Sequence, residues 1–125
     1  MPLRVGIDLV QVAQVAASLD EHGDHYLRRV FTEQEVADCS RDGAPSPLRL
    51  AARFAAKEAA MKVLEPGPDA AVPWPSIEVV RNPGGAPSLR LHGPAADLAA
   101  AAGLTAFALS FTHEAAYAAA VVVGT

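Results

Sequence analysis

The feature that most constrains the fold of this chain is a helix-forming segment at its centre, residues 48–64. The segment is rich in alanine, leucine and charged side chains, and Pro66-Gly67-Pro68 follows it directly. Proline has no amide hydrogen to donate inside a helix, so this sequence ends a helix sharply. The pattern predicts that residues 48–64 form the strongest helix of the chain.

Strand-forming segments lie on both sides of this helix. Residues 3–10 read LRVGIDLV, a run of β-branched and apolar side chains that is typical of a buried strand. Residues 77–80 and 88–92 flank an Asn-Pro-Gly-Gly turn and predict a hairpin. Residues 104–112 and 115–123 predict two final strands that flank a turn.

Further helices are expected in the first half of the chain and near its end. Residues 11–21 carry apolar side chains at helical spacing, and residues 25–30 predict a short helical turn. Thr32 and Glu35 form a T-x-x-E capping box, which predicts a helix start near Glu33. Pro94 is expected in the first turn of a last helix, before Gly103. The order predicts an α+β fold with a mostly antiparallel sheet and helices packed on one face.

The composition is that of one globular domain, residues 1–125. The chain is 51% hydrophobic, enough to form a core without disulfides, but its many alanines predict a thin core and favour oligomerisation. Cys39 is the only cysteine, which excludes an internal disulfide or a multi-cysteine zinc site and suggests a reducing, cytoplasmic location. We expect no secretory signal and no membrane span.

The charge distribution is uneven. The net charge of −4 argues against broad nucleic-acid binding, which needs a basic surface. Seven of the ten Lys and Arg residues nevertheless fall between Arg28 and Lys62. Such a local basic region would attract an anionic ligand or an acidic partner.

The central helix also carries the most informative group of charged residues. Phe54, Glu58 and Lys62 lie in one i, i+4 row, and Arg53 and Lys57 lie in the adjacent row. One side of the helix is thus expected to offer a carboxylate flanked by up to three cations. The alternative is a solvated Glu–Lys pair that only stabilises the helix.

Asp8 is an acid inside a predicted buried strand, where it needs a partner or a metal. The alternative is an Asp at the strand end that caps the next helix. If Asp8 and Glu58 come together, two carboxylates suit Mg²⁺, which completes its shell with water and phosphate oxygens. The neighbouring cations would then bind the remaining phosphate oxygens.

Other candidates are weaker. His113 lies at a predicted turn between strands, where a lone histidine is more often a structural hydrogen-bonding residue than a catalyst. The segment 82–87, NPGGAP, contains glycines but reads most simply as a hairpin turn. No Walker A loop or G-x-S-x-G nucleophile elbow is present.

Several short motifs occur along the chain. They are G-I-D at residues 6–8, [FW]-A-x-K-E-A-x-x-K at 54–62 and an R-x-[FL]-T-x-x-E type segment at 29–35. An N-x-x-G-x-P turn lies at 82–87 and S-x-[ST]-H at 110–113, followed by Tyr117. Together these motifs resemble those of the short holo-acyl-carrier-protein synthases of the 4′-phosphopantetheinyl transferase superfamily, and the resemblance extends over nearly the whole chain.

The resemblance implies an enzyme that transfers 4′-phosphopantetheine from coenzyme A to a serine of an apo acyl carrier protein, in fatty acid or polyketide biosynthesis. Asp8 and Glu58 would ligate Mg²⁺, and Lys62 would neutralise charge on the pyrophosphate as 3′,5′-ADP leaves. The implied coenzyme A-binding residues are Arg53, Lys57, Gly85, Pro87, Thr112 and His113. The family's small members are homotrimers with active sites between subunits, so a homotrimer is implied here too.

Two positions depart from the family pattern. The first helix lacks the basic residue that family members often use to dock an acidic carrier protein, and Gln14 stands where a cation is expected. Arg28 and Arg29 are therefore the candidate docking residues. Ala86 replaces the lysine often found before the proline of the turn motif.

Two alternative functions remain open from the sequence. One is a non-catalytic coenzyme A-binding or trimeric interaction protein with the same fold. The other is a metal-dependent phosphohydrolase that uses the same two carboxylates and water. The intact set of Asp8, Glu58 and Lys62 favours an enzyme over the binding protein.

Overall fold

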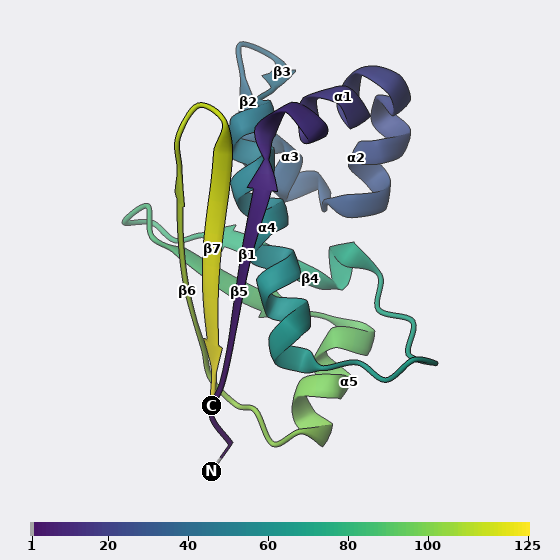
Figure 1. Ribbon diagram of the computed structural model, residues 1–125, viewed down its shortest axis with the longest axis vertical. Helices are drawn as coiled ribbons and strands as arrows, with labels where there is room; N and C mark the ends of the chain where they lie inside the picture. Colours follow the sequence, from purple (N-terminus) through teal and green to yellow (C-terminus); the bar gives the residue numbers. More distant parts are fainter. Residues whose placement is uncertain (1) are drawn as a thin grey trace.

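The structure is a computed structural model that describes residues 2–125, so Met1, the first residue of the predicted domain, lies outside the described part. Figure 1 shows its helices and strands in chain order. They are β1 (Arg4–Gln11), α1 (Val12–His22), α2 (Asp24–Val30), α3 (Glu33–Cys39), β2 (Ser40–Arg41), β3 (Ala44–Pro45), α4 (Pro47–Leu64), a 3-10 turn η1 (Trp74–Ser76), β4 (Ile77–Arg81), β5 (Pro87–Leu91), α5 (Gly93–Ala101), β6 (Phe107–His113) and β7 (Tyr117–Gly124).

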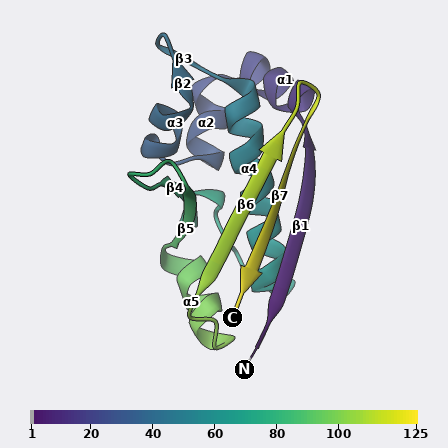
Figure 2. The same ribbon diagram turned by 90° about the vertical axis from the view of Figure 1, so that its left-hand side faces the viewer.

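The main sheet joins the two ends of the chain. The last strand, β7, lies between β1 and β6 and pairs antiparallel with both, with Asp8 opposite Ala120 and Phe111 also opposite Ala120. Figures 1 and 2 show these three strands together on one side of the molecule, with α4 along one face of the sheet. Within residues 2–125 no helix lies against the other face of the sheet (Figures 1 and 2).

Helix α4 is the central element of the core. Ser46 caps its first turn by accepting from the amide of Arg49, Pro47 is its first residue, and Glu65 ends it in a left-handed conformation at φ 49°. Its buried side chains are mostly alanines, which allow the sheet to approach closely. Within residues 2–125 no helix is both long enough and apolar enough to cross a membrane.

Two glycines of the sheet allow this close approach. A Cβ atom on Gly6 of β1 would lie 2.0 Å from the carbonyl oxygen of Ala59 and 3.2 Å from the Cβ of Lys62. A Cβ atom on Gly124 of β7 would lie 2.8 Å from a methyl carbon of Val63. The sheet therefore contacts the backbone of α4, and β1 brings Asp8 beside the charged end of that helix.

The α+β fold predicted from the sequence is confirmed, with differences at its edges. The capping box is present: Thr32 accepts from the amide of Glu35 and Glu35 accepts from the amide of Thr32. The final hairpin starts later than predicted, because residues 105 and 106 bond to Thr125 before β6 begins. The described strands form three sheets, since β4 and β5 bond only to each other, although β5 lies beside β6.

Candidate active site

An acidic corner forms where β1 meets α4. Asp8 follows Gly6 along the strand, and Lys62 lies one turn after Glu58 on the helix. The Lys62 ammonium donates to Asp8 Oδ1 at 3.1 Å and to the carbonyl oxygen of Ile7 at 2.7 Å. The Lys62 side chain is 57% exposed, whereas that of Asp8 is 15% exposed. The three residues that the sequence predicted as a catalytic set therefore lie together.

The acidic corner has more negative charge than its own cation balances. Asp8 Oδ2 is buried and has no hydrogen-bond donor. The pKa of Glu58 is raised to about 7, mainly by burial and secondarily by the neighbouring Asp8 carboxyl, whereas Lys62 acts to lower it. A divalent cation would contact the unpartnered Asp8 Oδ2 and would balance the charges of the two neighbouring carboxyl groups. The residues present therefore fit Mg²⁺. No cluster of three or more metal-binding side chains occurs in residues 2–125.

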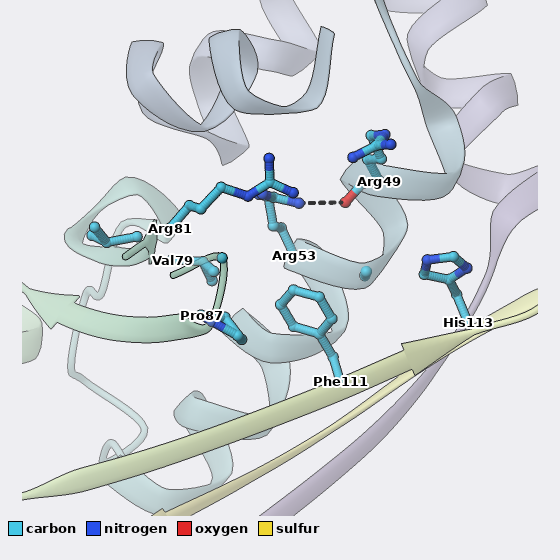
Figure 3. Close-up of a pocket in the computed structure, with 10 residues that line it drawn as sticks. Arg49, Arg53, Val79, Arg81, Pro87, Phe111 and His113 are labelled. Atoms are coloured by element: carbon cyan, nitrogen blue, oxygen red, sulfur yellow. Dashed lines mark hydrogen bonds between the residues drawn. The ribbon is translucent and has the colours of Figure 1, made fainter. Parts of the chain in front are cut away.

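A basic pocket lies on another side of α4. It is a cavity of about 110 Å³ between α4, the β4–β5 hairpin and the end of β6 (Figure 3). Its polar lining comprises Arg49, Arg53, Arg81 and His113, and its other lining residues are Ala52, Val79, Val80, Gly85, Pro87 and Phe111. The backbone of Gly85 has φ 89°, a left-handed conformation that suits glycine and turns the hairpin at the mouth of the pocket.

The positive charge of the basic pocket is not balanced by acids. None of the three guanidinium groups forms an ion pair with a carboxylate of residues 2–125. Arg53 is only 4% exposed, its Nε has no partner, and its guanidinium lies 5.9 Å from the centre of the Phe111 ring. Figure 3 shows Arg53 bonded to the carbonyl oxygen of Arg49 and lying over Phe111. One buried, one half-buried and one exposed guanidinium, none of them paired with a carboxylate, are together suited to binding an anion.

Lys57 does not lie with the other predicted binding residues. It is fully buried, and its ammonium donates to Glu35 Oε1 at 2.7 Å, to the carbonyl oxygen of Trp74 at 3.1 Å and to that of Ile77. All three protons of the ammonium are thus used inside the core. Burial lowers the pKa of Lys57, although Glu35 opposes this shift. The prediction that Lys57 binds coenzyme A phosphates is therefore wrong for this arrangement.

The acidic corner and the basic pocket do not meet within one chain. They share no lining residue, because Glu58 and Arg53 project from different sides of α4. Thr112 lies on the opposite face of β6 from His113, and it lines shallow grooves on the helix-free face of the sheet. His113 lines both the basic pocket and one of those grooves.

Sequence reasoning missed three residues of the basic pocket, which are Arg49, Arg81 and Phe111. Arg49 is four residues before Arg53, so helical spacing alone would have placed it in the same row. Arg81 directly precedes the Asn-Pro-Gly-Gly turn, but only the tertiary structure brings that turn to α4. Cys39 offers no alternative nucleophile, because it is buried and its burial raises the pKa of the thiol to about 11.

Comparisons with known proteins show which family the chain belongs to. The sequence model of the 4′-phosphopantetheinyl transferase superfamily matches residues 4–122. A holo-[acyl-carrier-protein] synthase of Koribacter versatilis is 43% identical over 98% of both chains. The chain belongs to the holo-acyl-carrier-protein synthase family of this superfamily. A further synthase of the family, from Halorhodospira halophila, is 40% identical over 95% of this chain and 94% of its own.

Solved structures of the holo-acyl-carrier-protein synthase family have the same fold. The synthase–CoA complex of Chronobacterium ammoniagenes superimposes with a TM-score of 0.84 at 30% identity, covering 99% of this chain and 97% of that one. The Helicobacter pylori holo-[acyl-carrier-protein] synthase in complex with coenzyme A also gives a TM-score of 0.84, at 25% identity, covering 98% and 100%.

Proposed function

We propose that this protein transfers 4′-phosphopantetheine from coenzyme A to a serine of an apo acyl carrier protein in a Mg²⁺-dependent reaction. The observation that carries the proposal is the acidic corner, where Asp8 Oδ2 lacks a donor beside Glu58 and Lys62. The coenzyme A-bound relatives support the choice of donor, and the names of the curated relatives support the choice of acceptor.

The reaction needs no nucleophile from this chain. The carrier serine oxygen forms a bond to the phosphorus that bears the pantetheine, and the bridging P–O bond of the pyrophosphate breaks. The electron pair of that bond leaves with 3′,5′-ADP, and the serine proton is released to the solvent. Positioning and charge neutralisation carry most of the rate enhancement in transfers of this type.

Each charged residue has one task in this proposal. Asp8 and Glu58 hold the metal ion, which when bound supplies positive charge to the pyrophosphate oxygens. Lys62 stabilises the negative charge that develops on the leaving group. Arg53 and His113 bind coenzyme A phosphates in the basic pocket, with Gly85 and Pro87 beside the nucleotide and Thr112 at the sheet face.

The decisive assay incubates the protein with coenzyme A and Mg²⁺, with and without an apo carrier protein, and measures the carrier mass and 3′,5′-ADP. Transfer requires that 3′,5′-ADP appears only with the carrier, in an amount equal to the holo carrier formed. Release of 3′,5′-ADP without a carrier would indicate a phosphohydrolase. Binding of coenzyme A without any release would indicate a non-catalytic protein. A panel of carriers would define the pathway, and a cytoplasmic location stays a prediction.

We further propose a homotrimer whose active sites lie between subunits. The helix-free sheet face is apolar along β1, where Leu3, Val5, Ile7 and Leu9 are 75%, 67%, 67% and 64% exposed. An apolar face of this kind favours association. Both halves of the site also open onto this face, since Asp8 and Lys62 border a groove beside Ile7, and His113 borders one beside Leu9. A second copy packed here would bring an acidic corner to a basic pocket.

A subunit-mixing experiment tests the shared site. We expect the Asp8→Ala and His113→Ala proteins each to be weak alone, and a co-refolded equal mixture to regain about one quarter of wild-type activity. In random assembly that fraction of head-to-tail interfaces combines an intact corner with an intact pocket. Light scattering should give about three times the chain mass of 13.0 kDa. An active monomer, or a mixture no better than the mean of its components, would refute the shared site.

Arg28 and Arg29 are proposed to dock the carrier protein. Both are exposed on α2. The pKa of Tyr26 on the same helix is raised to about 12, mainly by burial and secondarily by the charge of Glu58. Carriers of this pathway are usually acidic and this protein is acidic overall, so a local basic patch must provide the attraction.

Replacing Arg28 and Arg29 together with glutamate should raise the KM for the carrier about tenfold or more and leave the KM for coenzyme A unchanged. Added salt should slow the wild-type protein more than the double variant, because salt screens an attraction that the variant lacks. The measurement is steady-state kinetics at two ionic strengths. Weaker coenzyme A binding with an unchanged carrier KM would assign the arginines to the nucleotide site instead.

A further inference from the structure

A fully buried ion pair lies behind the basic pocket. Neither of its residues lines the pocket. It joins Lys57 of α4 to Glu35 of α3, both with 0% exposure. Isolated buried charges are costly, so a pair of this kind is expected to have every hydrogen-bonding position filled. Each partner here does so, and both bond to backbone atoms of β4.

Lys57 attaches α4 to the start of the β4–β5 hairpin. Besides Glu35, its ammonium donates to the carbonyl oxygens of Trp74 and Ile77, which lie in η1 and at the first residue of β4. Lys57 follows Arg53 by one helical turn. The wall of the pocket that carries Arg49 and Arg53 is therefore held directly to the strand that carries Arg81.

Glu35 attaches the same strand from the other side. Its Oε2 accepts from the amide of Val79 at 2.9 Å, and Val79 itself lines the basic pocket. Its Oε1 accepts from both Lys57 and the amide of Thr32. Thr32 in turn donates to Glu78 of β4 at 2.7 Å, so a second bond fixes the strand to the cap of α3.

These bonds matter because β4 has few other polar attachments to the rest of the fold. Among the described strands, β4 forms a ladder only with β5. No strand ladder therefore sets the distance between the Arg53 wall and the Arg81 wall of the pocket. The buried pair, the Thr32–Glu78 bond and the apolar packing of Ile77 and Val79 set it.

We propose that Lys57 and Glu35 are positioning residues for coenzyme A: their buried ion pair fixes the two walls of the basic pocket at the separation needed to bind one anionic ligand. This inference rests on the proposed function. It assigns neither residue a contact with the substrate. It also explains why a lysine of the central motif points into the core rather than into the pocket.

The two partners allow a sharp test, because direct electrostatics and positioning predict opposite results for Glu35. Removing a nearby negative charge would by itself tighten the binding of a polyanion. If Glu35 acts by positioning, Glu35→Gln should instead weaken coenzyme A binding about tenfold, as Lys57→Met does. The double variant Glu35→Leu, Lys57→Met should weaken binding no more than either single change, because the two residues act as one unit.

The measurements are the dissociation constant of coenzyme A by calorimetry and the KM for each substrate, with Val63→Ala as the matched control. Val63 is equally buried on α4 and has no polar side-chain contact. Its truncation should lower the midpoint of unfolding without changing the affinity for coenzyme A. The network variants should raise the KM for coenzyme A and leave the carrier KM within about twofold.

Three results would overturn the positioning role: tighter or unchanged coenzyme A binding by folded Glu35→Gln, additive losses in the double variant, or an equal loss in Val63→Ala. If a single variant does not fold, the double variant decides, because replacing both partners of a buried pair with apolar side chains is often tolerated. A wild-type protein that fails to bind coenzyme A would overturn the proposed function as well. Wild-type binding with equal binding by the variants would overturn the positioning role alone.

Discussion

Replacing Asp8 with asparagine is expected to reduce transfer by about three orders of magnitude or more, because the proposed metal ion would lose one of its two protein ligands. Glu58→Gln should have a similar effect for the same reason. Neither change is expected to unfold the protein. When the charge of Asp8 is removed, the Lys62 ammonium still donates to the carbonyl oxygen of Ile7. The loss should therefore appear in kcat and kcat/KM rather than in folding.

Stability separates this result from a general loss of structure. In the metal-free protein, Asp8 and Glu58 are two neighbouring acids, and the pKa of Glu58 is raised to about 7 by burial and by Asp8. Asp8→Asn removes one of these like charges, so the metal-free variant should unfold at the same or a higher denaturant concentration than wild type. Asp97→Asn, an exposed change on α5, serves as the control and should retain full activity. Wild-type turnover by Asp8→Asn or Glu58→Gln at ordinary Mg²⁺ concentrations would disprove the metal assignment.

Gly6→Ala is expected to destabilise the protein by at least about 3 kcal/mol, a large share of the stability of a small domain. The added methyl would overlap the carbonyl oxygen of Ala59 at 2.0 Å, and backbone atoms on both sides cannot turn away as a flexible side chain can. Relief requires β1 to move off α4. The third atom that the methyl approaches is the Cβ of Lys62, so any folded fraction would also have a displaced acidic corner.

The measurement for Gly6→Ala is denaturant unfolding at one fixed protein concentration, because assembly makes stability depend on concentration. Gly67→Ala is the matched control, since nothing lies within 4 Å of its added Cβ and no positive φ constrains it. This control should remain within about 0.5 kcal/mol of wild type. A Gly6→Ala protein as stable as the control would show that β1 does not contact α4 as closely as described.

Both parts of the acidic corner, Asp8 on β1 and the Glu58–Lys62 row on α4, were predicted as candidates from the sequence. An acid in an apolar strand and a Glu–Lys row in a strong helix are each unusual enough to be noticed, because burying a charge has a high cost. Local rules also predicted the limits of α4 and the cap of α3, since both depend on neighbouring residues. What these rules did not predict is the pairing of β1 with β7, which joins the two ends of the chain.

The burial of Lys57 could not be predicted from the sequence. Helical spacing alone placed it beside Glu58 and Arg53 as a third cation for the substrate. Spacing gives the direction of a side chain relative to its own helix, but it does not say which direction is covered. The acceptors of Lys57 come from α3, η1 and β4, which are distant in the chain and meet only in the folded protein.

By itself, the sequence determined the class of fold and the strong central helix, because these depend on local propensity. The cost of burying charge marked Asp8 as a residue that needs a partner, and its chemistry with Glu58 and Lys62 stays a prediction. Only the tertiary structure decided which cations line the cavity. Arg49 and Arg81 join Arg53 around one cavity, while Lys57 is used in the core. Only the tertiary structure separated the acidic corner from the basic pocket, because that separation depends on which sides of α4 the sheet and the hairpin cover.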